Sequence, residues 1–211
     1  MLTMSTQHSI ADIRNADPNG PIAQEIMNAF NSMHGSPEVF AYFFCRFPTC
    51  VSGDRPIDAF DILTGSGSNG KSLTKAAMNS ALGDYFYEPS SSLITLKKTA
   101  LGAASSELAK LRGKRCTMPS EAENEDVLQV GFLKNLLGGD KIQGRELYKE
   151  CIEFKPQTNL FPSFNEIPAV NDSSNGLARR LRIVRYPFQF VDREPNGPRE
   201  KRMDTSLRAK F

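Results

Sequence analysis

Residues 61–76, DILTGSGSNGKSLTKA, constrain the fold of this chain more than any other stretch of its sequence. They contain the pattern G-x-x-x-x-G-K-[ST], in which Gly65, Gly70, Lys71 and Ser72 hold the fixed positions. Glycines at this spacing let a loop wrap around phosphate groups, the lysine neutralises phosphate oxygens, and the hydroxyl after it can hold Mg²⁺. The pattern therefore predicts a phosphate-binding loop, or P-loop, between a strand and a helix.

The flanking sequence agrees with this placement. Residues 59–63, AFDIL, are typical of a strand, and residues 71–82 are typical of a helix whose positive end faces the loop. We expect the loop to bind the phosphates of ATP. The predicted nucleotide-binding residues are Gly65, Ser66, Gly67, Ser68, Asn69, Gly70, Lys71 and Ser72.

The rest of the chain alternates between helical and extended patterns. Helices are predicted at residues 21–35, 36–47, 105–114 and 126–139, strands at residues 115–121, 158–165 and 180–190, and a two-stranded hairpin at residues 141–155. Strands that alternate with helices are typical of an α/β fold. We therefore expect a central, mostly parallel sheet flanked by helices.

Three parts are expected along the chain. Residues 1–19 are predicted to be a flexible leader, residues 20–54 a small N-terminal helical segment, and residues 55–211 the P-loop ATPase core. The core has a basic end, because residues 179–211 hold ten Lys and Arg against four Asp and Glu, in a chain of net charge +2. Such an end is either a solvated tail or a surface that contacts the phosphates of a nucleotide or nucleic acid.

The cysteine and histidine content argues against a metal-binding module. The four cysteines, at positions 45, 50, 116 and 151, form no C-x-x-C pair, and the chain has only two histidines, so no zinc site is expected. Free thiols are typical of a reducing compartment. The longest apolar run, residues 39–45, is too short to span a bilayer, and no signal peptide is expected at the N-terminus. These features predict a cytoplasmic protein.

Four later stretches carry a family resemblance. They are KRCTMPSEAEN (114–124), FLKNLLGGDKIQGRELYKECIEFKP (132–156), FNEIPAV (164–170) and GLARRLRIVRYPF (176–188). In this order and spacing, together with the P-loop, they resemble the superfamily 3 helicases, most closely the primase-helicase branch of poxviruses, giant DNA viruses, phages and plasmids. The resemblance covers roughly residues 50–195, and LLGGDKIQGRELY is its most specific element.

The resemblance implies an AAA+-like ATPase core that assembles as a homo-oligomeric ring, usually a hexamer. Such a ring threads single-stranded DNA, or one strand of a forked duplex, and unwinds DNA with ATP and Mg²⁺. Proteins of this family replicate the DNA of viruses and mobile elements. The implied partners therefore include a primase domain or other replication proteins, in the cytoplasm of a virus-infected or bacterial host cell, and no membrane.

The resemblance also implies roles for residues of the ATPase site. Glu121 matches the acid of the second motif, which helps to hold Mg²⁺ and polarises the attacking water, with Glu123 as the rival position. Ser72 is the other implied Mg²⁺ ligand. Asn165 matches the sensor that contacts the γ-phosphate or the attacking water. From residue type alone, a Glu after a strand or an Asn before a turn can equally be a solvated end.

Further positions are implied outside the P-loop. Arg180 matches the arginine finger that reaches the ATP of a neighbouring subunit, with Arg179 as the close rival. Lys149 lies at the expected tip of the hairpin, which in this family projects into the pore and contacts DNA. Tyr148 beside it could stack on a base or pack within the protein. Without the resemblance, all of these could be ordinary surface or turn residues.

The sequence departs from the family pattern in two ways. Pro119 and Pro162 interrupt strands that should lie inside the sheet, where proline removes a hydrogen-bond donor, so we expect a bulge or a strand end at each. The acids of the second motif, Glu121 and Glu123, are not adjacent, which leaves open which of them holds the metal and which activates water.

Two other functions are compatible with a P-loop. A small-molecule kinase would need a lid with clustered arginines and an acceptor pocket. An ATP-switched DNA-loading or origin-binding factor would load on DNA without unwinding it. A GTPase is disfavoured, because no N-K-x-D signature follows the loop.

Overall fold

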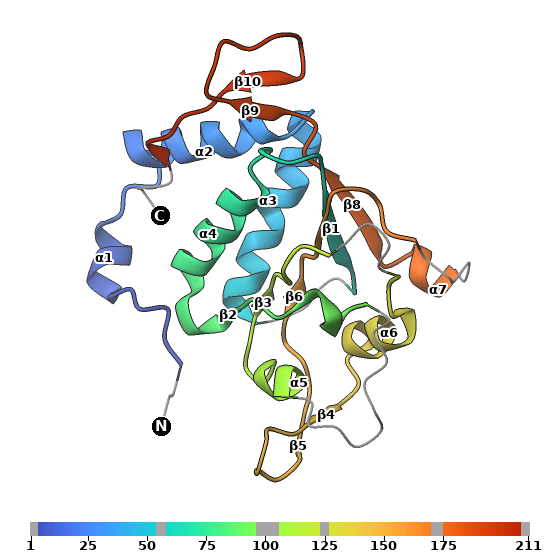
Figure 1. Ribbon diagram of the computed structural model, residues 1–211. Helices are drawn as coiled ribbons and strands as arrows, with labels where there is room; N and C mark the ends of the chain where they lie inside the picture. The colour runs from blue at the N-terminus through green and yellow to red at the C-terminus, as the bar shows by residue number, and fades with distance from the viewer. Residues whose placement is uncertain (1–3, 54–57, 96–105, 123–126, 170–174, 208–211) are drawn as a thin grey trace.

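The computed structural model describes residues 4–53, 58–95, 106–122, 127–169 and 175–207. Helices and strands alternate along the chain and surround a central group of strands (Figure 1). The helices are α1 (Ile10–Asn15), α2 (Pro21–Met33), α3 (Pro37–Ser52), α4 (Lys71–Leu82), α5 (Ser106–Lys110), α6 (Val130–Gly138) and α7 (Asn175–Ala178), with 3₁₀ turns η1 (Gly83–Tyr85) and η2 (Ser91–Leu93). The strands are β1 (Phe60–Thr64), β2 (Phe86–Tyr87), β3 (Cys116–Thr117), β4 (Ile142–Gly144), β5 (Ile152–Phe154), β6 (Asn159–Leu160), β7 (Ser163–Phe164), β8 (Leu181–Arg185), β9 (Gln189–Val191) and β10 (Glu200–Arg202).

Strand β1 lies at the centre of the fold. Every one of its residues is buried, and it pairs in parallel with β8 along its whole length and with β7 near its carboxyl end. A second parallel sheet has the strand order β2-β3-β6. Strands β9 and β10 form a parallel pair, and β4 and β5 form an antiparallel hairpin. The mixed α/β architecture with parallel strands agrees with the sequence prediction.

Pro162 divides the strand expected at residues 158–165 into two. β6 pairs with β3 and β7 pairs with β1, and only Phe161 and Pro162 separate them. Phe161 N donates to Thr117 O in one sheet, and Leu63 N donates to Pro162 O in the other, both at 2.9 Å. Because proline has no N–H for a ladder, the strand changes its partner at this residue. Instead of one central sheet, the structure therefore has two three-stranded sheets that meet at this point.

Pro119 shortens the strand expected at residues 115–121 in the same way. Strand β3 ends at Thr117, two residues before the proline. The chain remains extended beside its neighbour, since Ser120 N donates to Pro89 O at 2.9 Å. The missing donor of Pro119 thus falls at a strand end, as the sequence predicted.

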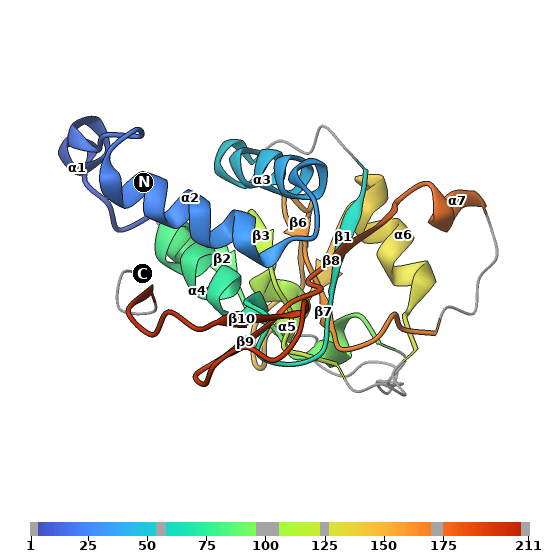
Figure 2. The ribbon, with the colours of Figure 1, turned by 90° about the horizontal axis from the view of Figure 1, so that it is seen from above.

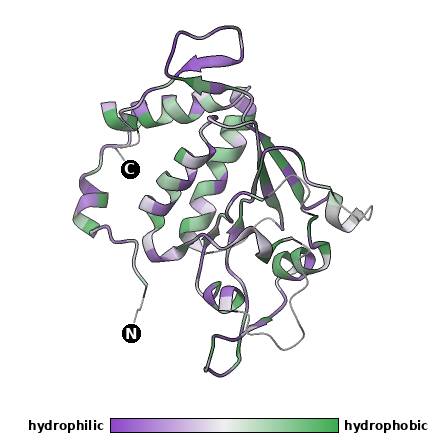
Figure 3. Cartoon of the chain, viewed as in Figure 1, coloured by the Kyte–Doolittle hydropathy of each residue, from purple (hydrophilic) through white to green (hydrophobic). Residues whose placement is uncertain are grey.

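Two hydrophobic clusters cover the two faces of the sheet around β1. Successive residues of a strand point to opposite faces. Leu63 packs with residues of α2, α3 and α4, whereas Phe60 and Ile62 pack with residues of α6. Figures 1 and 2 show the same division, with α2, α3 and α4 on one side of β1 and α6 and α7 on the other. Burial on both faces accounts for the apolar residues Phe60, Ile62 and Leu63 of β1, whereas β8 is mostly exposed. In Figure 3 the connection between β9 and β10 is purple.

The N-terminal helices begin at the expected residues. Pro21 opens α2, and the Ser36 hydroxyl accepts from Val39 N (3.3 Å) at the start of α3. Helix α3 runs beyond its expected end, through Pro48, and stops at Gly53, which has a left-handed φ of 73°. Proline removes one helical hydrogen bond, but the burial of the apolar face of α3 outweighs that loss.

The stretch expected to be a flexible leader, residues 1–19, contains helix α1. Ser9 and Asp12 form a reciprocal capping box at its start, and none of its residues is buried. In both views of the ribbon, α1 stands at the edge of the molecule (Figures 1 and 2). Within the described ranges, no helix is both long and apolar enough to cross a membrane.

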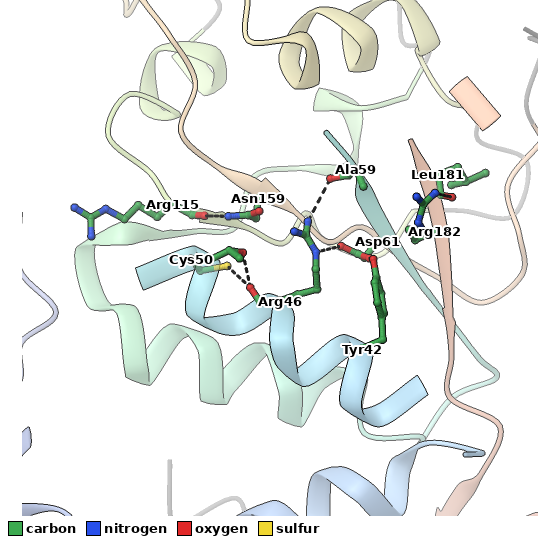
Figure 4. Close-up of polar contacts among 10 residues, drawn as sticks. Tyr42, Arg46, Cys50, Ala59, Asp61, Arg115, Asn159, Leu181 and Arg182 are labelled. Atoms are coloured by element: carbon green, nitrogen blue, oxygen red, sulfur yellow. Dashed lines mark hydrogen bonds and ion pairs between the residues drawn. The ribbon is translucent and has the colours of Figure 1, made fainter. Parts of the chain in front are cut away.

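A buried polar network fastens α3 to β1 (Figure 4). Arg46 Nε donates to Asp61 Oδ2 at 2.9 Å, and the hydroxyl of Tyr42 donates to Asp61 Oδ1 at 2.5 Å. The side chains of Arg46 and Asp61 are only 2% and 0% exposed. Burial and the hydrogen bond to Asp61 raise the pKa of Tyr42, so its hydroxyl stays protonated and donates.

Removing one member of this buried pair should destabilise the fold strongly. We expect Arg46→Met to lower the free energy of unfolding by about 3–5 kcal/mol, because it leaves the Asp61 carboxylate buried without a cation. The matched change at an exposed arginine, Arg112→Met, should alter the free energy of unfolding by less than about 0.5 kcal/mol. Chemical denaturation of each variant measures its free energy of unfolding. Adding Asp61→Asn to Arg46→Met should restore much of the lost free energy of unfolding. A double variant as unstable as Arg46→Met alone would contradict the proposal that Arg46 stabilises the fold by neutralising the Asp61 carboxylate.

Candidate functional site

Two glycines of the P-loop occupy positions that no other residue could take without strain. Gly65 has φ +156°, and a Cβ there would lie 2.4 Å from the Tyr186 carbonyl oxygen. Gly70 has φ +97°, and a Cβ there would lie 2.6 Å from Met33 Sδ. The backbone can therefore turn tightly from β1 into α4 only because both side chains are absent.

The rest of the loop is held by hydrogen bonds. Asn69 Nδ2 donates to Ser66 O (3.1 Å), and Lys71 N donates to Asn69 Oδ1 (3.3 Å). Ser68 has a positive φ of 56°, and its carbonyl oxygen accepts from Phe190 N at 2.7 Å. Strand β9 thus supports the loop from outside.

Lys71 points to the carboxyl edge of the parallel strands. Its ammonium is buried and donates to Gly65 O at 2.7 Å, to Phe164 O at 3.0 Å and to Glu121 Oε1 at 3.0 Å. Parallel strands place their carboxyl ends at one edge of a sheet, which is where α/β proteins commonly bind ligands. Lys71 is therefore positioned where a phosphate chain would arrive.

Glu121 and Asn165 lie at the same edge. Glu121 follows β3, and Asn165 directly follows β7. In the amide orientation that satisfies both of its polar atoms, Asn165 Nδ2 donates to Glu121 Oε1 at 2.9 Å and to Gly65 O at 3.3 Å. Three residues widely separated in sequence, Lys71, Glu121 and Asn165, thus meet in one cluster. The rival acid, Glu123, lies outside the described residues.

The donor set suits Mg²⁺ bound together with phosphates. Among the described residues, no group of three or more His, Cys, Asp or Glu side chains could hold a metal ion. Ser72, at the start of α4, and Glu121 offer a hydroxyl and a carboxylate, both oxygen ligands of the kind that Mg²⁺ prefers. The remaining ligands would come from the nucleotide and from water, which fits a metal that arrives with ATP.

Arg180 lies at the opposite edge of the sheet. It directly precedes β8, whose first residue, Leu181, pairs with Phe60 at the start of β1. Because β1 runs five residues from there to the P-loop, Arg180 is about 16 Å from the loop along the strand. Its Nη1 donates to Gly176 O at 3.0 Å. Arg180 and the exposed Arg179 therefore lie away from the P-loop of their own chain.

Two arginines that the sequence analysis did not single out lie beside the P-loop. Arg185 and Arg199 line a cavity of about 450 Å³ that is also lined by Gly65, Ser66 and Asn165. Arg185 pairs in register with Thr64, the last residue of β1. The end of the strand RLRIVR could have indicated Arg185, whereas nothing local in the sequence indicates Arg199.

The hairpin predicted from the sequence is present. Strands β4 and β5 pair with Ile142 opposite Phe154, and residues 145–151 connect them. A Cβ on Gly144, the last residue of β4 before the turn, would lie 2.4 Å from Ala109 N, so this part of the hairpin packs tightly on α5. In Figure 1 the hairpin projects from one end of the molecule, opposite to β9 and β10.

Lys149 and Tyr148 lie in the exposed turn of the hairpin. Tyr148 has a positive φ of 62° and a relative exposure of 102%, so it does not pack within the protein. The side chain of Lys149 is 69% exposed and forms an ion pair with Glu146. The Lys149 ammonium lowers the pKa of the Glu146 carboxyl group, which stays ionised. The turn thus presents a cation and an aromatic ring to solvent.

Relatives of the chain are found among proteins of large DNA viruses. "Putative helicase L207/L206" of Acanthamoeba polyphaga mimivirus is 37% identical over 150 residues, which are 71% of this chain. "Putative helicase 022R" of Frog virus 3 is 27% identical over 186 residues, and "Putative primase C962R" of African swine fever virus is 24% identical over 192 residues. This chain is a homologue of these viral proteins, which are named as putative helicases and primases. No family model matches it.

These viral helicase and primase homologues are much longer than the chain. It spans 16%, 19% and 20% of the three proteins, while 71%, 86% and 89% of the chain is aligned with them. The solved C-terminal region of NrS-1 has the same fold, with TM-scores of 0.60 and 0.65 at 15% and 14% identity in two structures. Each match covers 88% of the chain and 41–42% of the NrS-1 region. The resemblance to the viral primase-helicase branch is confirmed.

Proposed function

We propose that this chain is the ATPase core of a superfamily 3 DNA helicase, which works as a homo-oligomeric ring on single-stranded DNA. The observation that carries the proposal is the meeting of Lys71, Glu121 and Asn165 at the edge of the sheet where the P-loop lies. A cation for the phosphates, an acid for the metal and the water, and an amide sensor are the groups that hydrolysis of ATP needs. The homology to viral helicase proteins supports the motor function.

Each residue has a separate task in this proposal. The P-loop backbone and Lys71 would hold the β- and γ-phosphates, and Ser72 and Glu121 would hold Mg²⁺, which would supply neutralisation of the phosphate charge. Glu121 also orients the attacking water, and Asn165 positions that water or the γ-phosphate. Lys71 Nζ lies 3.0 Å from Glu121 Oε1. A phosphate bound by Lys71 would therefore lie next to the carboxylate that is proposed to hold the metal and orient the water.

The proposed DNA contact is made by the hairpin turn. Lys149 would bind the phosphate backbone, and the fully exposed Tyr148 would stack on a base. A ring would bring one such turn from each subunit to a central pore. Movement of the hairpins with the nucleotide state would then pull the strand.

The Lys149 assignment predicts a selective loss of DNA coupling. We expect Lys149→Ala to lower DNA-stimulated ATPase activity and strand displacement about 5- to 10-fold, because each subunit then offers one cation fewer to the phosphate backbone. The dependence of DNA binding on salt should become weaker by about 0.7 in log–log slope for each phosphate that the variant no longer neutralises. Basal ATPase activity should be kept, since the hairpin lies outside the nucleotide site.

Lys141→Ala is the matched control for this experiment. Lys141 lies at the base of the same hairpin, is 68% exposed and pairs with Glu153. Its replacement should leave unwinding and the salt dependence nearly unchanged. Normal unwinding by the Lys149→Ala protein would remove the hairpin turn from the proposed mechanism.

The proposed function is tested by measuring ATP hydrolysis with and without single-stranded DNA, together with displacement of a labelled strand from a fork. A helicase core should hydrolyse ATP faster with DNA and displace the strand. DNA-stimulated hydrolysis without displacement would instead identify a loading factor. Phosphate transfer from ATP to a small acceptor, without any response to DNA, would identify a kinase.

A further inference from the structure

Tyr186, which directly follows β8, contacts both ends of the P-loop. At the start of the loop, Tyr186 N donates to Thr64 O at 2.8 Å, and a Cβ on Gly65 would lie 2.4 Å from the carbonyl oxygen of Tyr186. At the end of the loop, the Tyr186 hydroxyl lies 3.1 Å from Thr74 Oγ1, in the first turn of α4. A single residue of the protein interior therefore connects the two ends of the loop.

The contact at the end of the loop continues into the backbone. Thr74 Oγ1 donates to Gly70 O at 3.1 Å, and Thr74 N donates to the same oxygen at 2.9 Å. A threonine hydroxyl has one proton to donate. When this proton is donated to Gly70 O, Thr74 Oγ1 accepts from the Tyr186 hydroxyl. Burial raises the pKa of Tyr186, so its hydroxyl keeps the proton that this chain of hydrogen bonds requires.

The chain of hydrogen bonds lies in the hydrophobic core. Tyr186 is 2% exposed and Thr74 is 0% exposed. The centre of the Tyr186 ring lies 4.8 Å from that of His34 and 6.3 Å from that of Phe43. Close packing of this kind leaves a large ring few other rotamers, and a buried hydroxyl is costly without a partner. The core thus holds the Tyr186 hydroxyl at a defined distance from the start of α4.

We propose that Tyr186 is a positioning residue of the ATPase site, which acts through Thr74 on the carbonyl oxygen of Gly70. The proposal rests on the proposed ATPase function and adds a residue that sets the geometry of the P-loop from the core. Gly70 directly precedes Lys71 and Ser72, so the position of its carbonyl oxygen determines where both side chains begin. These groups must be placed accurately for catalysis, since a misplacement of about 1 Å can lower a rate by about 10²-fold.

The test removes one hydroxyl at a time and measures kcat for ATP hydrolysis and, by calorimetric titration, the binding of Mg²⁺-tripolyphosphate. Tyr186→Phe and Thr74→Val should each lower kcat about tenfold and weaken tripolyphosphate binding about threefold or more, because the loop is then less well ordered for its ligand. The double variant should be no worse than either single variant, because both changes break the same chain of hydrogen bonds. Thr74→Ser keeps the hydroxyl and should hydrolyse ATP at close to the normal rate.

Tyr42→Phe is the matched control for a general loosening of the core. It also removes a tyrosine hydroxyl that forms a hydrogen bond, in this case with Asp61 at 2.5 Å. Tyr42→Phe should lower the free energy of unfolding but keep normal kcat and normal tripolyphosphate binding. The inference is overturned if folded Tyr186→Phe and Thr74→Val proteins keep normal kcat and binding, or if Tyr42→Phe or Thr74→Ser loses as much activity as they do.

Failure of the proposed ATPase function would give a different result. A wild-type protein that binds tripolyphosphate but does not hydrolyse ATP would contradict that function, and the affinity of the Tyr186→Phe protein for tripolyphosphate would then decide the inference by itself. A wild-type protein that neither hydrolyses ATP nor binds tripolyphosphate would overturn both.

Discussion

Replacement of Lys71 by alanine is expected to lower the rate of ATP hydrolysis by about 10³-fold. Lys71 contacts the carboxylate of Glu121 at the carboxyl edge of the sheet, and its ammonium also donates to the carbonyl oxygens of Gly65 and Phe164. In the variant, the negative charge that develops on the β–γ bridging oxygen during hydrolysis would no longer be stabilised by the Lys71 ammonium. A steady-state phosphate-release assay at saturating ATP measures the change.

The fold should survive this replacement. Lys71 makes polar contacts, and the carboxylate that loses its partner, Glu121, is 47% exposed and can be hydrated by water. The control is Lys75→Ala, which removes a lysine from the next turn of α4, where it pairs with Glu88. This control should hydrolyse ATP at close to the normal rate. A folded Lys71→Ala protein with normal turnover would end the proposed P-loop chemistry.

Replacement of Arg180 by alanine should leave ATP binding intact but lower hydrolysis by about 10³- to 10⁵-fold. Arg180 precedes β8, at the edge of the sheet away from the P-loop of its own chain. We propose that it reaches the nucleotide of a neighbouring subunit, where it neutralises charge on the γ-phosphate from the side that the P-loop leaves open. ATPase activity per subunit should therefore rise with protein concentration as subunits associate.

Mixing two inactive proteins tests this shared site directly. In a mixture of Arg180→Ala and Lys71→Ala subunits, some interfaces pair an intact P-loop with an intact Arg180, so part of the activity should return. Arg179→Ala is the comparison, because Arg179 is the rival position for the finger and is exposed. A larger loss of hydrolysis in Arg179→Ala than in Arg180→Ala would assign the role to Arg179. Activity per subunit that stays constant across assembly, with no recovery on mixing, would place catalysis within one chain.

The P-loop could be predicted from its own sequence pattern, whereas Glu121 and Asn165 were indicated only by the family resemblance. All three stretches follow a strand. The P-loop follows β1, Glu121 follows β3 and Asn165 follows β7. Parallel strands bring such positions to one edge whatever the loops between them contain. The hairpin was predictable for a similar reason, since two short extended runs joined by a few polar residues pair locally.

Features that depend on distant partners could not be predicted in this way. The acid in β1, Asp61, carries no sequence signal for its pairing with Arg46 on α3, because the pairing depends on how the helix crosses the sheet. Strand β10 is joined to α2 by Lys201 Nζ, which donates to Ser32 O, 169 positions away in the sequence. The break at Pro162 was expected, but the exchange of strand partners there depends on the packing of both sheets.

The contacts of the P-loop with Met33 and Phe190 set a lower limit on the size of a working unit. Met33 lies against Gly70 from α2, and the N–H of Phe190 in β9 supports the carbonyl oxygen of Ser68. The sequence motifs of the ATPase site all lie between these two residues. A protein truncated to those motifs would keep all of them but would lose the contacts of Met33 and Phe190 with the P-loop. The presence of the sequence motifs is therefore a poor guide to how far the chain can be shortened.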